Sequence, residues 1–475
     1  MDDETRLNQT QPEGNRKFLT AACWFVVVAL SFTIRFERNA AIPPFDDLYH
    51  LKRIEFSAAN FPRVLSFDPD RGITGAFCPW PPLYDLGAAA IYLAFGDVRH
   101  LPPIFFSLFA AAICLGGRPP AMKLPARLLA ALTIAVSPYL INVSRSGAID
   151  HHFVEPLFVL LILTAIGRPV LLAVAVTAAL MVQPALIVAA GLAFLCIFVL
   201  REGRGGALAF GMAGAAIVAY RLVQPDGYPD SPWFLGYSHA LALFGAAVAC
   251  ALRRRVAAPI AMAAGAAIAL CSPATLQGFR FFSGDPWLQS IVEFKPMFRD
   301  PSRIGTDVAN LTGGAILSLT LFRRYPALAI FASGYLLLAL TSRRFLVPAI
   351  PLFAIGGALA VAHARTKLAA IAFAASLLLP PLFWHWGAAP AAGPAPYFRS
   401  VGLSFKPLPP GRVLAPWSYG HAIDVLGGKA VVLDNFGSAP DPIAFYEANQ
   451  ALQLMGDKTL RLWCARRGIR YVRRQ

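Results

Sequence analysis

The sequence predicts an all-α polytopic membrane domain that is followed by a small α/β soluble domain. Of the 475 residues 57% are hydrophobic and only 14% are charged, which excludes an ordinary soluble protein. Apolar runs near bilayer length recur from residue 18 to residue 384, as expected for a series of transmembrane helices. Beyond residue 385 these runs give way to a Pro-, Gly- and Ala-rich stretch and then to a segment of mixed composition. We therefore expect a membrane domain at 18–385 and a soluble domain at 386–475.

The first seventeen residues are polar and carry charges of both signs, so we expect a cytoplasmic tail at 1–17. The apolar run after them has no small-residue cleavage site, which indicates a retained signal anchor. In all, the pattern predicts about thirteen transmembrane helices. Their expected ranges are 18–35, 101–116, 124–141, 153–167, 169–182, 184–200, 206–222, 238–252, 256–271, 311–322, 326–342, 345–363 and 367–384.

The positions of Lys and Arg predict the orientation of these helices. With the N-terminus in the cytoplasm, almost every inner loop carries a basic cluster, as the positive-inside rule requires. We assign 83–95 to a helix within an outer loop, because counting it as a span would reverse every later loop. The same distribution accounts for the net charge of +16 without nucleic acid as a partner.

The outer face collects the ionisable residues in two large loops, 36–100 and 272–310, and in one short loop. The short loop holds Asp150, His151, His152 and Glu155 between two apolar runs. Ionisable groups at the edge of a bilayer are costly and usually functional. Carboxylates suit hard ions such as Mg²⁺ and Mn²⁺, and imidazole suits transition metals. We therefore expect a metal site here, with either His151 or His152 facing inward.

The pair Arg343 and Arg344 falls between two spans on the outer side, where such a pair is not expected. It breaks the positive-inside rule, so a role at the outer site explains it better than topology does. A guanidinium binds phosphate through its forked donors. A metal and a phosphate at the membrane surface indicate a lipid-linked phosphate or pyrophosphate donor, and hence a membrane transferase or phosphatase.

The soluble segment contains two expected strands. Ala430 to Leu433 follows a glycine turn, and Arg470 to Val472 is the second short strand. The segment is too small to build a large core alone, so we expect it to pack on the membrane domain.

Five outer segments resemble, in order, motifs of the catalytic subunit of oligosaccharyltransferases, which N-glycosylate proteins. They are Asp46-Asp47-Leu48-Tyr49-His50, Gly147 to His152, Ser290-Ile291-Val292-Glu293, Ser342-Arg343-Arg344-Phe345 with Pro348, and Pro416-Trp417-Ser418-Tyr419-Gly420-His421 followed by Leu433-Asp434-Asn435. The second segment is closest to the archaeal form with Asp-x-His. The single-subunit bacterial and archaeal members have about thirteen spans and an outer soluble domain in a C-type glycosyltransferase fold.

The resemblance implies roles for individual residues. Asp46, Asp150 and His152 would hold Mn²⁺ or Mg²⁺, with Asp47 as the alternative to Asp46. Asp46 and Glu293 would be catalytic, and would hold the acceptor nitrogen for attack. Arg344, Trp417 and Tyr419 would bind the substrates, which are a polyprenyl-linked glycan and a protein or peptide. The implied location is a prokaryotic inner or plasma membrane, with the soluble domain periplasmic or extracytoplasmic.

This sequence departs from the family pattern at three places. Pro416 and Ser418 stand where the acceptor motif has Trp and Asp, the family's contacts to the hydroxyl residue of the acceptor. The soluble segment is shorter than in family members. An arginine usually lies seven residues before the second-loop Asp, but that position is Val143 here and the nearest arginine is Arg145.

Two other functions stay open at this point. A transferase of the same broad fold could act on a lipid, a glycan or a hydroxyl side chain, since it would need no sequon recognition. A transporter or an inactive scaffold is the third possibility. The clustering of the acids in outer loops disfavours it, because transporters place polar residues at the bilayer midplane.

Overall fold

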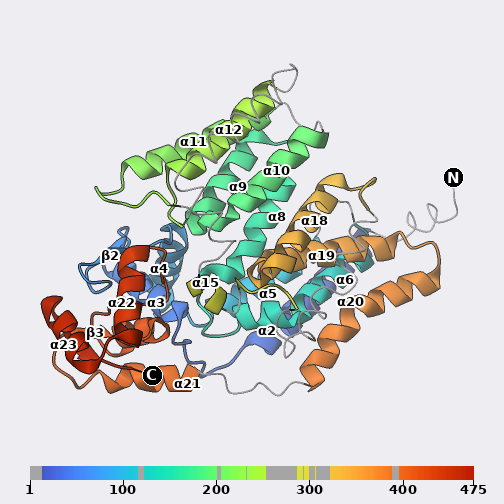
Figure 1. Ribbon diagram of the computed structural model, residues 1–475. Coiled ribbons are helices and arrows are strands. Elements are labelled where there is room, and N and C mark those ends of the chain that lie inside the picture. Colours follow the sequence, from blue (N-terminus) through green and yellow to red (C-terminus); the bar gives the residue numbers. More distant parts are fainter. Residues whose placement is uncertain are drawn as a thin grey trace.

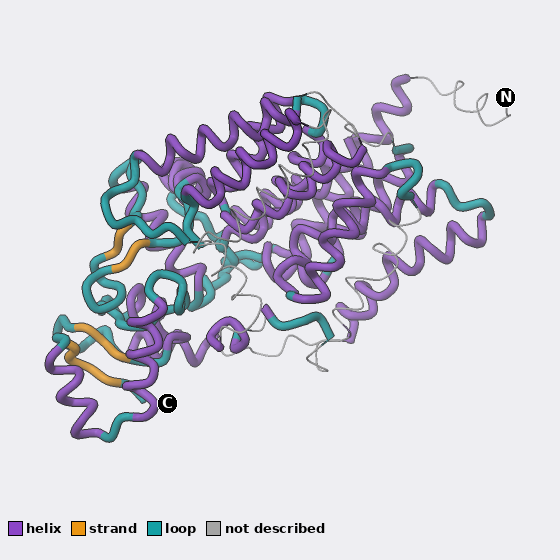
Figure 2. The backbone as a smooth tube through the Cα atoms, turned by 45° about the horizontal axis from the view of Figure 1, so that its top comes forward, coloured by secondary structure: helices purple, strands orange, loops and turns teal. Residues whose placement is uncertain are grey.

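A computed structural model describes residues 13–115, 122–200, 205–231, 233–252, 286–291, 294–298, 305, 321–387 and 395–474. A bundle of helices forms most of the molecule, and the smaller C-terminal part lies beside the helices and strands of the first outer loop (Figure 1). Among the residues that the structure describes, the strands lie at this end of the molecule, as Figure 2 shows. The expected predominance of helices with a few strands is therefore confirmed.

The helices follow the expected apolar runs closely. Those that precede the soluble segment are α2 Glu13–Arg35, α3 Asp46–Ala59, α4 Leu83–Phe95, α5 Leu101–Leu115, α6 Leu124–Val136, α7 Pro138–Ser144, α8 Glu155–Ala165, α9 Pro169–Val182, α10 Ile187–Leu200, α11 Gly206–Leu222, α12 Tyr237–Leu252, α15 Pro286–Ser290, α18 Pro326–Thr341, α19 Leu346–Ala362 and α20 Lys367–Gly387. Short 3-10 turns precede three of them, at η1 His151–Val154, η2 Pro184–Leu186 and η5 Arg343–Phe345. The expected run 256–271 and most of 311–322 lie outside the described residues.

Two helices within the described ranges are long and apolar enough to cross a membrane, at Lys17–Arg35 and Arg343–Ala362. A third candidate is the pair α6 and α7, which bend by 62° at their junction. Pro138 opens α7, and a proline drives the residue before it out of the helical region, here Ser137 with ψ 121°. The other apolar helices have 10–17 residues. The expectation of about thirteen full spans is not confirmed, because prolines and short turns divide the apolar runs into shorter helices.

Helix α19 lies at the centre of the bundle. All residues from Leu346 to Ala360 are buried, and the helix packs against α6, α8, α18 and α20. A helix that is apolar on every face is stable only when neighbours surround it. Because η5 leads directly into α19, the arginines at its outer end are held by the most deeply packed helix.

The first outer loop carries α3 and α4, which pack against each other. The expected loop helix at 83–95 is confirmed as a helix, since α4 covers these residues. Between α3 and α4 lies an antiparallel pair of short strands, β1 Phe67–Asp68 and β2 Ala76–Phe77. The loop is therefore a folded layer over one end of the bundle.

The C-terminal segment comprises α21 Ala395–Ser404, β3 Arg412–Leu414, η6 Trp417–Tyr419, η7 Ala422–Leu426, α22 Pro442–Leu454, α23 Asp457–Arg466 and β4 Ile469–Val472. Strand β4 contains the expected strand at 470–472 and pairs in parallel with β3. The expected strand at 430–433 is wrong, because only Val431 there makes bridges, one to Val413 and one to Arg71. Val431 bridges one residue of the C-terminal segment and one of the first outer loop. Its neighbours at 430–433 therefore form no regular strand.

Buried ion pairs fasten the C-terminal segment to the first outer loop. Arg71 donates from Nε and Nη2 to the two oxygens of Asp434, at 2.6 and 3.2 Å. Its guanidinium also lies 4.0 Å from the ring centroid of Phe436. Arg71 and Asp434 are both buried, so each charge depends on the other.

A second ion-pair cluster lies beside the first. Lys52 donates to Asp68 at 2.8 Å and to both oxygens of Asp424 at 2.9 Å. Burial raises the pKa of Asp424 to about 7, against the opposing charge of Lys52. The backbone N–H of Val431 adds a hydrogen bond to the carbonyl of Asp70 at 2.7 Å. The C-terminal segment thus packs on the first outer loop, within the part of the chain on which we expected it to pack.

Arg71→Ala should undock the C-terminal segment, because it leaves the Asp434 carboxylate buried without its partner. Breaking such a pair costs about 3–5 kcal/mol. We expect amide hydrogen exchange to accelerate at Val431, whose N–H group bonds to the carbonyl of Asp70 across this junction. The control is Arg474→Ala, which removes an exposed pair with Asp457 and should cost less than about 1 kcal/mol. Equal exchange in the two variants would show that the buried pair does not hold the segment.

Candidate functional site

A cavity of about 810 Å³ opens where the bundle, the first outer loop and the C-terminal segment meet. All five motif segments contribute to its walls. Of the expected site residues, Asp46, Asp150, His152, Arg344 and Trp417 line it. Segments that lie hundreds of residues apart in sequence therefore share one space.

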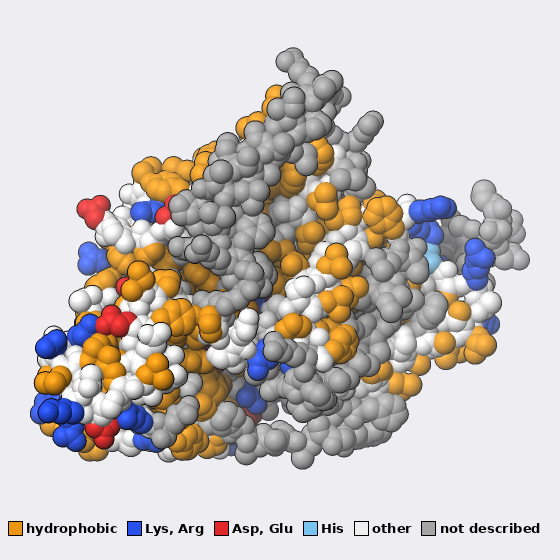
Figure 3. Space-filling view, viewed as in Figure 1, with side chains coloured by type: hydrophobic (Ala, Val, Ile, Leu, Met, Phe, Trp, Pro, Cys, Tyr) orange, Lys and Arg blue, Asp and Glu red, His pale blue; other side chains and the backbone are white. Residues whose placement is uncertain are grey.

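The cavity is apolar along most of its wall and charged at one end. Its aromatic side chains are Phe45, Trp80, Tyr139, Trp233, Trp287, Phe294, Phe345, Phe398, Trp417 and Phe436. Ligand pockets are typically built in this way, with a few polar groups fixing the orientation of an apolar-bound molecule. On the face that Figure 3 displays, by contrast, Lys and Arg side chains gather over the C-terminal segment. The carboxylates of Asp47 and Glu155, by contrast, are buried.

Asp150 contacts more of the ionisable side chains at the charged end than its neighbours do, through its backbone and both carboxylate oxygens. Gly147, at φ +85°, allows the tight approach that precedes it, because a Cβ there would lie 2.6 Å from the carbonyl oxygen of Ala41. The backbone N–H of Asp150 then donates to Oδ1 of Asp47 at 3.0 Å. Burial, followed by the charge of Asp150, raises the pKa of Asp47 to about 7. Asp47, the alternative to Asp46, is thus in direct contact with the Asp150 loop.

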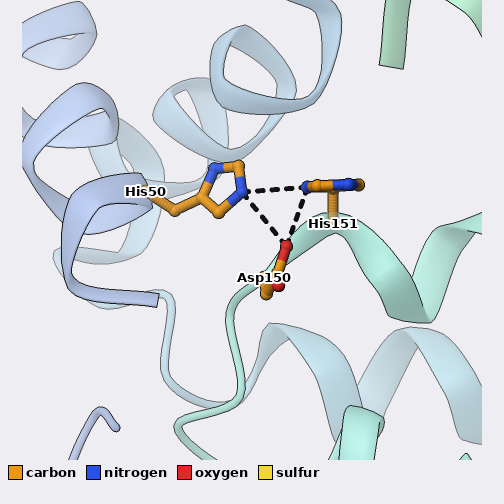
Figure 4. A group of neighbouring side chains, drawn as sticks. All are labelled: His50, Asp150 and His151. Carbon is orange, nitrogen blue, oxygen red and sulfur yellow. Dashed lines mark hydrogen bonds and ion pairs between the residues drawn. The ribbon is translucent and has the colours of Figure 1, made fainter. Parts of the chain in front are cut away.

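Three imidazoles surround the Asp150 carboxylate. Oδ1 lies 3.2 Å from His50 Nε2 and 2.7 Å from His151 Nδ1, as Figure 4 shows. Oδ2 lies 3.2 Å from His152 Nε2. Burial alone would raise the pKa of Asp150, but His152 and His151 hold it well below its usual value. Both candidate histidines therefore contact Asp150, each on its own oxygen.

Glu155 extends the row of charges toward Arg344. His152 Nδ1 lies 2.8 Å from Glu155 Oε1, and the same oxygen lies 3.7 Å from Arg344 Nη2. Glu155 was not among the residues expected to act in the site. Its spacing of three residues from His152 was the available signal, since such residues are neighbours on a helical turn.

His50 was also missed, together with the two residues that hold it. Its Nδ1 lies 2.7 Å from Asp85 Oδ1, and Arg53 Nη1 lies 2.5 Å from Asp85 Oδ2. Burial lowers the pKa of His50, but the charges of Asp85 and Asp150 outweigh it and raise the value to about 9. The signal in the sequence was Asp85 itself, because a lone acid inside the apolar run 83–95 needs a buried partner.

Asp46 stands apart from these contacts. It lines the cavity, its side chain is 36% exposed, and its Oδ1 lies 3.6 Å from Nε2 of the buried His421. Within the described part of the chain, the side-chain groups spaced for a metal ion are His50–Asp150–His151 and His151–His152–Glu155. Asp46 belongs to neither group, and its role as a metal ligand stays a prediction.

The donor atoms of this end fit a divalent ion. Asp150 Oδ1 is buried and has no hydrogen-bond donor aligned with it, although two ring nitrogens lie beside it. A buried carboxylate oxygen without a donor is costly, and a cation would satisfy it. The mixed imidazole and carboxylate donors suit a transition metal such as Mn²⁺ or Zn²⁺ better than Mg²⁺.

The other end of the cavity carries the expected acceptor residues. Trp417, Ser418 and Asn435 line it, and Trp417 meets Trp287 edge to face at 6.2 Å between ring centroids. Tyr419 is buried against Phe398 and is not among the lining residues. Its role in substrate binding therefore stays a prediction. Glu293, the second expected catalytic residue, lies outside the described residues.

The chain lacks the arginine that the family has seven residues before the second-loop Asp, but Arg145 lies at the same cavity wall. Val143 occupies the family position of that arginine, and both Val143 and Arg145 line the cavity. Arg145, Arg343 and Arg344 thus bring three guanidinium groups to the wall of one cavity. Such groups suit the binding of an anion such as phosphate.

Trp287 joins α15 to the C-terminal segment. Its ring lies over Gly437, where an added Cβ would be 1.9 Å from the indole. Gly437 has φ +55°, a conformation that glycine adopts without strain. The ring is buried with Leu414, Leu433 and Phe445 in the apolar core of the segment. This contact places Ser290 and Ile291, which follow in sequence, at the cavity wall.

Comparison with solved structures identifies a similar fold. The crystal structure of the oligosaccharyltransferase of Archaeoglobus fulgidus in the apo form superposes with a TM-score of 0.78 at 17% identity, covering 96% of this chain and 69% of that one. The complex of this archaeal enzyme, AglB, with an inhibitory peptide and a dolichol-phosphate gives the same values. Its complex with Zn and sulfate gives a TM-score of 0.70 at 17% identity, covering 95% and 67%.

No protein-family model and no curated protein sequence matches this chain. The structural match confirms, at the level of the fold, the resemblance to oligosaccharyltransferases that the five motifs indicate. The helical bundle, the outer loop and the C-terminal segment together have the fold of the archaeal enzyme.

Gly437→Ala should displace α15 from the cavity wall, because the new Cβ collides with Trp287. The matched control is Gly428→Ala, which has a similar φ of +60° and open space around the added Cβ. Both changes carry left-handed strain of about 1 kcal/mol, and only Gly437→Ala adds overpacking of about 1–3 kcal/mol. Hydrogen exchange of α15 should therefore accelerate in the first variant alone. The same exchange rate in both would mean that Trp287 does not seat the helix.

Proposed function

We propose that this chain is an oligosaccharyltransferase-like membrane glycosyltransferase, which moves a glycan from a polyprenyl phosphate or pyrophosphate carrier to a protein asparagine. The observation that carries the proposal is the convergence of five family-like motif segments on one cavity, in a chain with the archaeal enzyme's fold. The proposed setting is a prokaryotic inner or plasma membrane, with the N-terminus cytoplasmic and the site on the outer face. The membrane domain would span 18–385 and the outer soluble domain 386–475.

The charged end of the cavity is the proposed donor site. Arg344 would clamp the departing phosphate, and Arg145 and Arg343 add positive charge to the same wall. The aromatic and aliphatic wall would take the first part of the lipid chain. The archaeal neighbour was solved with a dolichol-phosphate and a peptide, which supports a lipid-linked donor and a peptide acceptor here.

The proposed chemistry begins with an amide nitrogen, which is a poor nucleophile. Asp46 and Glu293 would accept hydrogen bonds from it and hold it near the anomeric carbon. A divalent ion, Mn²⁺ or Mg²⁺, would neutralise the charge that develops on the leaving phosphate. Asp150 and His152, with Asp46 or Asp47, would hold that ion. Arg344 would stabilise the phosphate as it leaves.

A second candidate function differs only in the acceptor, which would be a lipid, a glycan or a hydroxyl side chain. The observation that favours it is the acceptor end, where Ser418 lines the cavity in place of the family's acidic residue and Pro416 replaces an aromatic one. This enzyme would keep the donor residues and need no sequon.

The test is transfer by the purified protein from a lipid-linked oligosaccharide to an Asn-x-Thr peptide with Mn²⁺, followed by mass spectrometry. Asp150→Ala should abolish transfer while the protein stays folded in detergent, and chelator should reduce the unaltered enzyme to background. Arg344→Lys should weaken donor affinity more than acceptor affinity, because it keeps the charge and loses the fork. The control is His363→Ala, at the end of α19 away from the cavity. Full turnover in excess chelator, or by Asp150→Ala, contradicts the metal-dependent mechanism. Transfer only to a hydroxyl acceptor favours the second function.

Discrimination between Asn-x-Thr and Asn-x-Ala peptides should be poorer than in typical oligosaccharyltransferases. The Ser418 hydroxyl accepts a weaker hydrogen bond from the acceptor hydroxyl than a carboxylate does, by about 1 kcal/mol. The double variant Ser418→Asp with Pro416→Trp should raise the ratio of the two transfer rates. Ser404→Asp, on α21 outside the cavity wall, is the control. A strong preference for threonine in the unaltered enzyme would contradict this assignment of the acceptor pocket.

A further inference from the structure

His50, His151 and Asp150 place three donor atoms around one point behind the cavity wall. His50 Nε2 and His151 Nδ1 are 3.0 Å apart, and they lie 3.2 and 2.7 Å from Asp150 Oδ1. His50 lies on α3, Asp150 directly precedes η1 and His151 is the first residue of η1, and the three side chains converge as Figure 4 shows. Ligands of a tetrahedral ion with bonds of about 2.0 Å are about 3.3 Å apart. The observed spacing is therefore close to that of a metal site.

The orientation of His50 is fixed from behind. Its ring stacks on Trp80 at 3.9 Å and 6°, and its Nδ1 faces Asp85. Arg53 holds Asp85 in place at 2.5 Å. A proton on Nδ1 directed at Asp85 leaves Nε2 as the metal-binding nitrogen. An imidazole ligand that donates its other N–H to a carboxylate is the usual outer support of a metal centre.

His151 has a corresponding support. Its Nε2 lies 2.7 Å from the side-chain amide of Gln183. An amide can present either its NH₂ group or its oxygen, so the Gln183 oxygen can accept a hydrogen bond from the N–H at His151 Nε2, which leaves Nδ1 for an ion. Asp150 contributes Oδ1, the buried oxygen that has no aligned hydrogen-bond donor.

We propose that His50 Nε2, His151 Nδ1 and Asp150 Oδ1 form an inner transition-metal site, with Asp85 and Gln183 orienting the two imidazoles. The site is distinct from the donors Asp46 and His152 of the proposed catalytic ion, because Asp150 turns its other oxygen, Oδ2, toward His152. His151 and Asp150 both line the cavity, so an ion reaches the site from there. The role of this ion in glycan transfer rests on the proposed function. The binding of the ion does not depend on that function.

The donor set predicts which metals bind. Two imidazoles and one carboxylate favour Zn²⁺ or Co²⁺ over Mg²⁺. Binding displaces any proton that His50 carries on Nε2, as it does for every imidazole ligand. The catalytic donors Asp46, Asp150 and His152 contain more oxygen and suit Mn²⁺. The two sites should therefore differ in metal preference.

The test titrates Zn²⁺ into the full-length, chelator-stripped protein in detergent against a chromogenic chelator. His50→Ala should weaken Zn²⁺ binding at least tenfold, and Asp85→Asn should weaken it about 10–100-fold, as the loss of an outer support does. His152→Ala, which removes the imidazole on the other oxygen of Asp150, is the matched control and should have a smaller effect than His50→Ala. His363→Ala should have none. Unchanged affinity in His50→Ala, or a larger loss in His152→Ala, overturns the proposal.

A second measurement needs no variant. X-ray absorption of the Zn²⁺-loaded, unaltered protein should show two imidazoles at about 2.0 Å, and fewer than two would overturn the proposal even if His50→Ala does not fold. Glycan transfer is measured separately. His50-dependent Zn²⁺ binding without any transfer would leave this site standing and reject the proposed function. Glycan transfer together with a Zn²⁺ affinity that does not depend on His50 would support the proposed function and reject this metal site.

Discussion

The charges buried around Asp150 are stable only because each one has a partner. From Arg53 the row passes through Asp85, His50, Asp150, His152 and Glu155 to Arg344, and cations and carboxylates alternate along it. Removing one ion from water costs several kcal/mol, and a lost partner leaves that cost uncompensated. The row therefore fixes the relative positions of α3, α4, the loop before η1 and η5. The cavity has its charged end where these four elements meet.

The two ends of the cavity are built on different principles. The charged end is supplied by the outer ends of packed helices, above all by η5 on the fully buried α19. The aromatic end is supplied by α15 and the C-terminal segment, whose own core is small. That segment borrows stability from the first outer loop, through Arg71 and Lys52, and from Trp287. Changes such as Pro416 and Ser418 at the aromatic end can therefore leave the charged end intact.

The amino-acid sequence predicted which segments line the cavity better than it predicted which side chains pair with one another there. Asp150, His152, Arg344 and Trp417 were found because ionisable or motif residues stand out against apolar runs, and the cavity brings them together. Asp85 and Glu155 could not be assigned, because a single sequence does not tell which buried acid faces which imidazole. The strand at 430–433 failed because Val431 bonds to the first outer loop, a contact that local propensity cannot foresee. The number of spans failed because each proline in an apolar run can end a helix or leave it continuous. Glu293 and Asp46 keep the roles that the resemblance gave them as predictions.

The ion pairs of the C-terminal segment have a consequence for biosynthesis. Lys52 and Asp424 are separated by 372 positions, and Arg71 and Asp434 by 363. The first outer loop is therefore made long before its partners leave the ribosome, and until then Arg71 has no Asp434 to pair with, whereas Lys52 still has Asp68. A nascent chain has only the charged half of the cavity, and the aromatic half is added by the last residues to be synthesised. A product truncated before Trp417 thus lacks the aromatic half of the cavity wall and leaves Arg71 without its carboxylate partner.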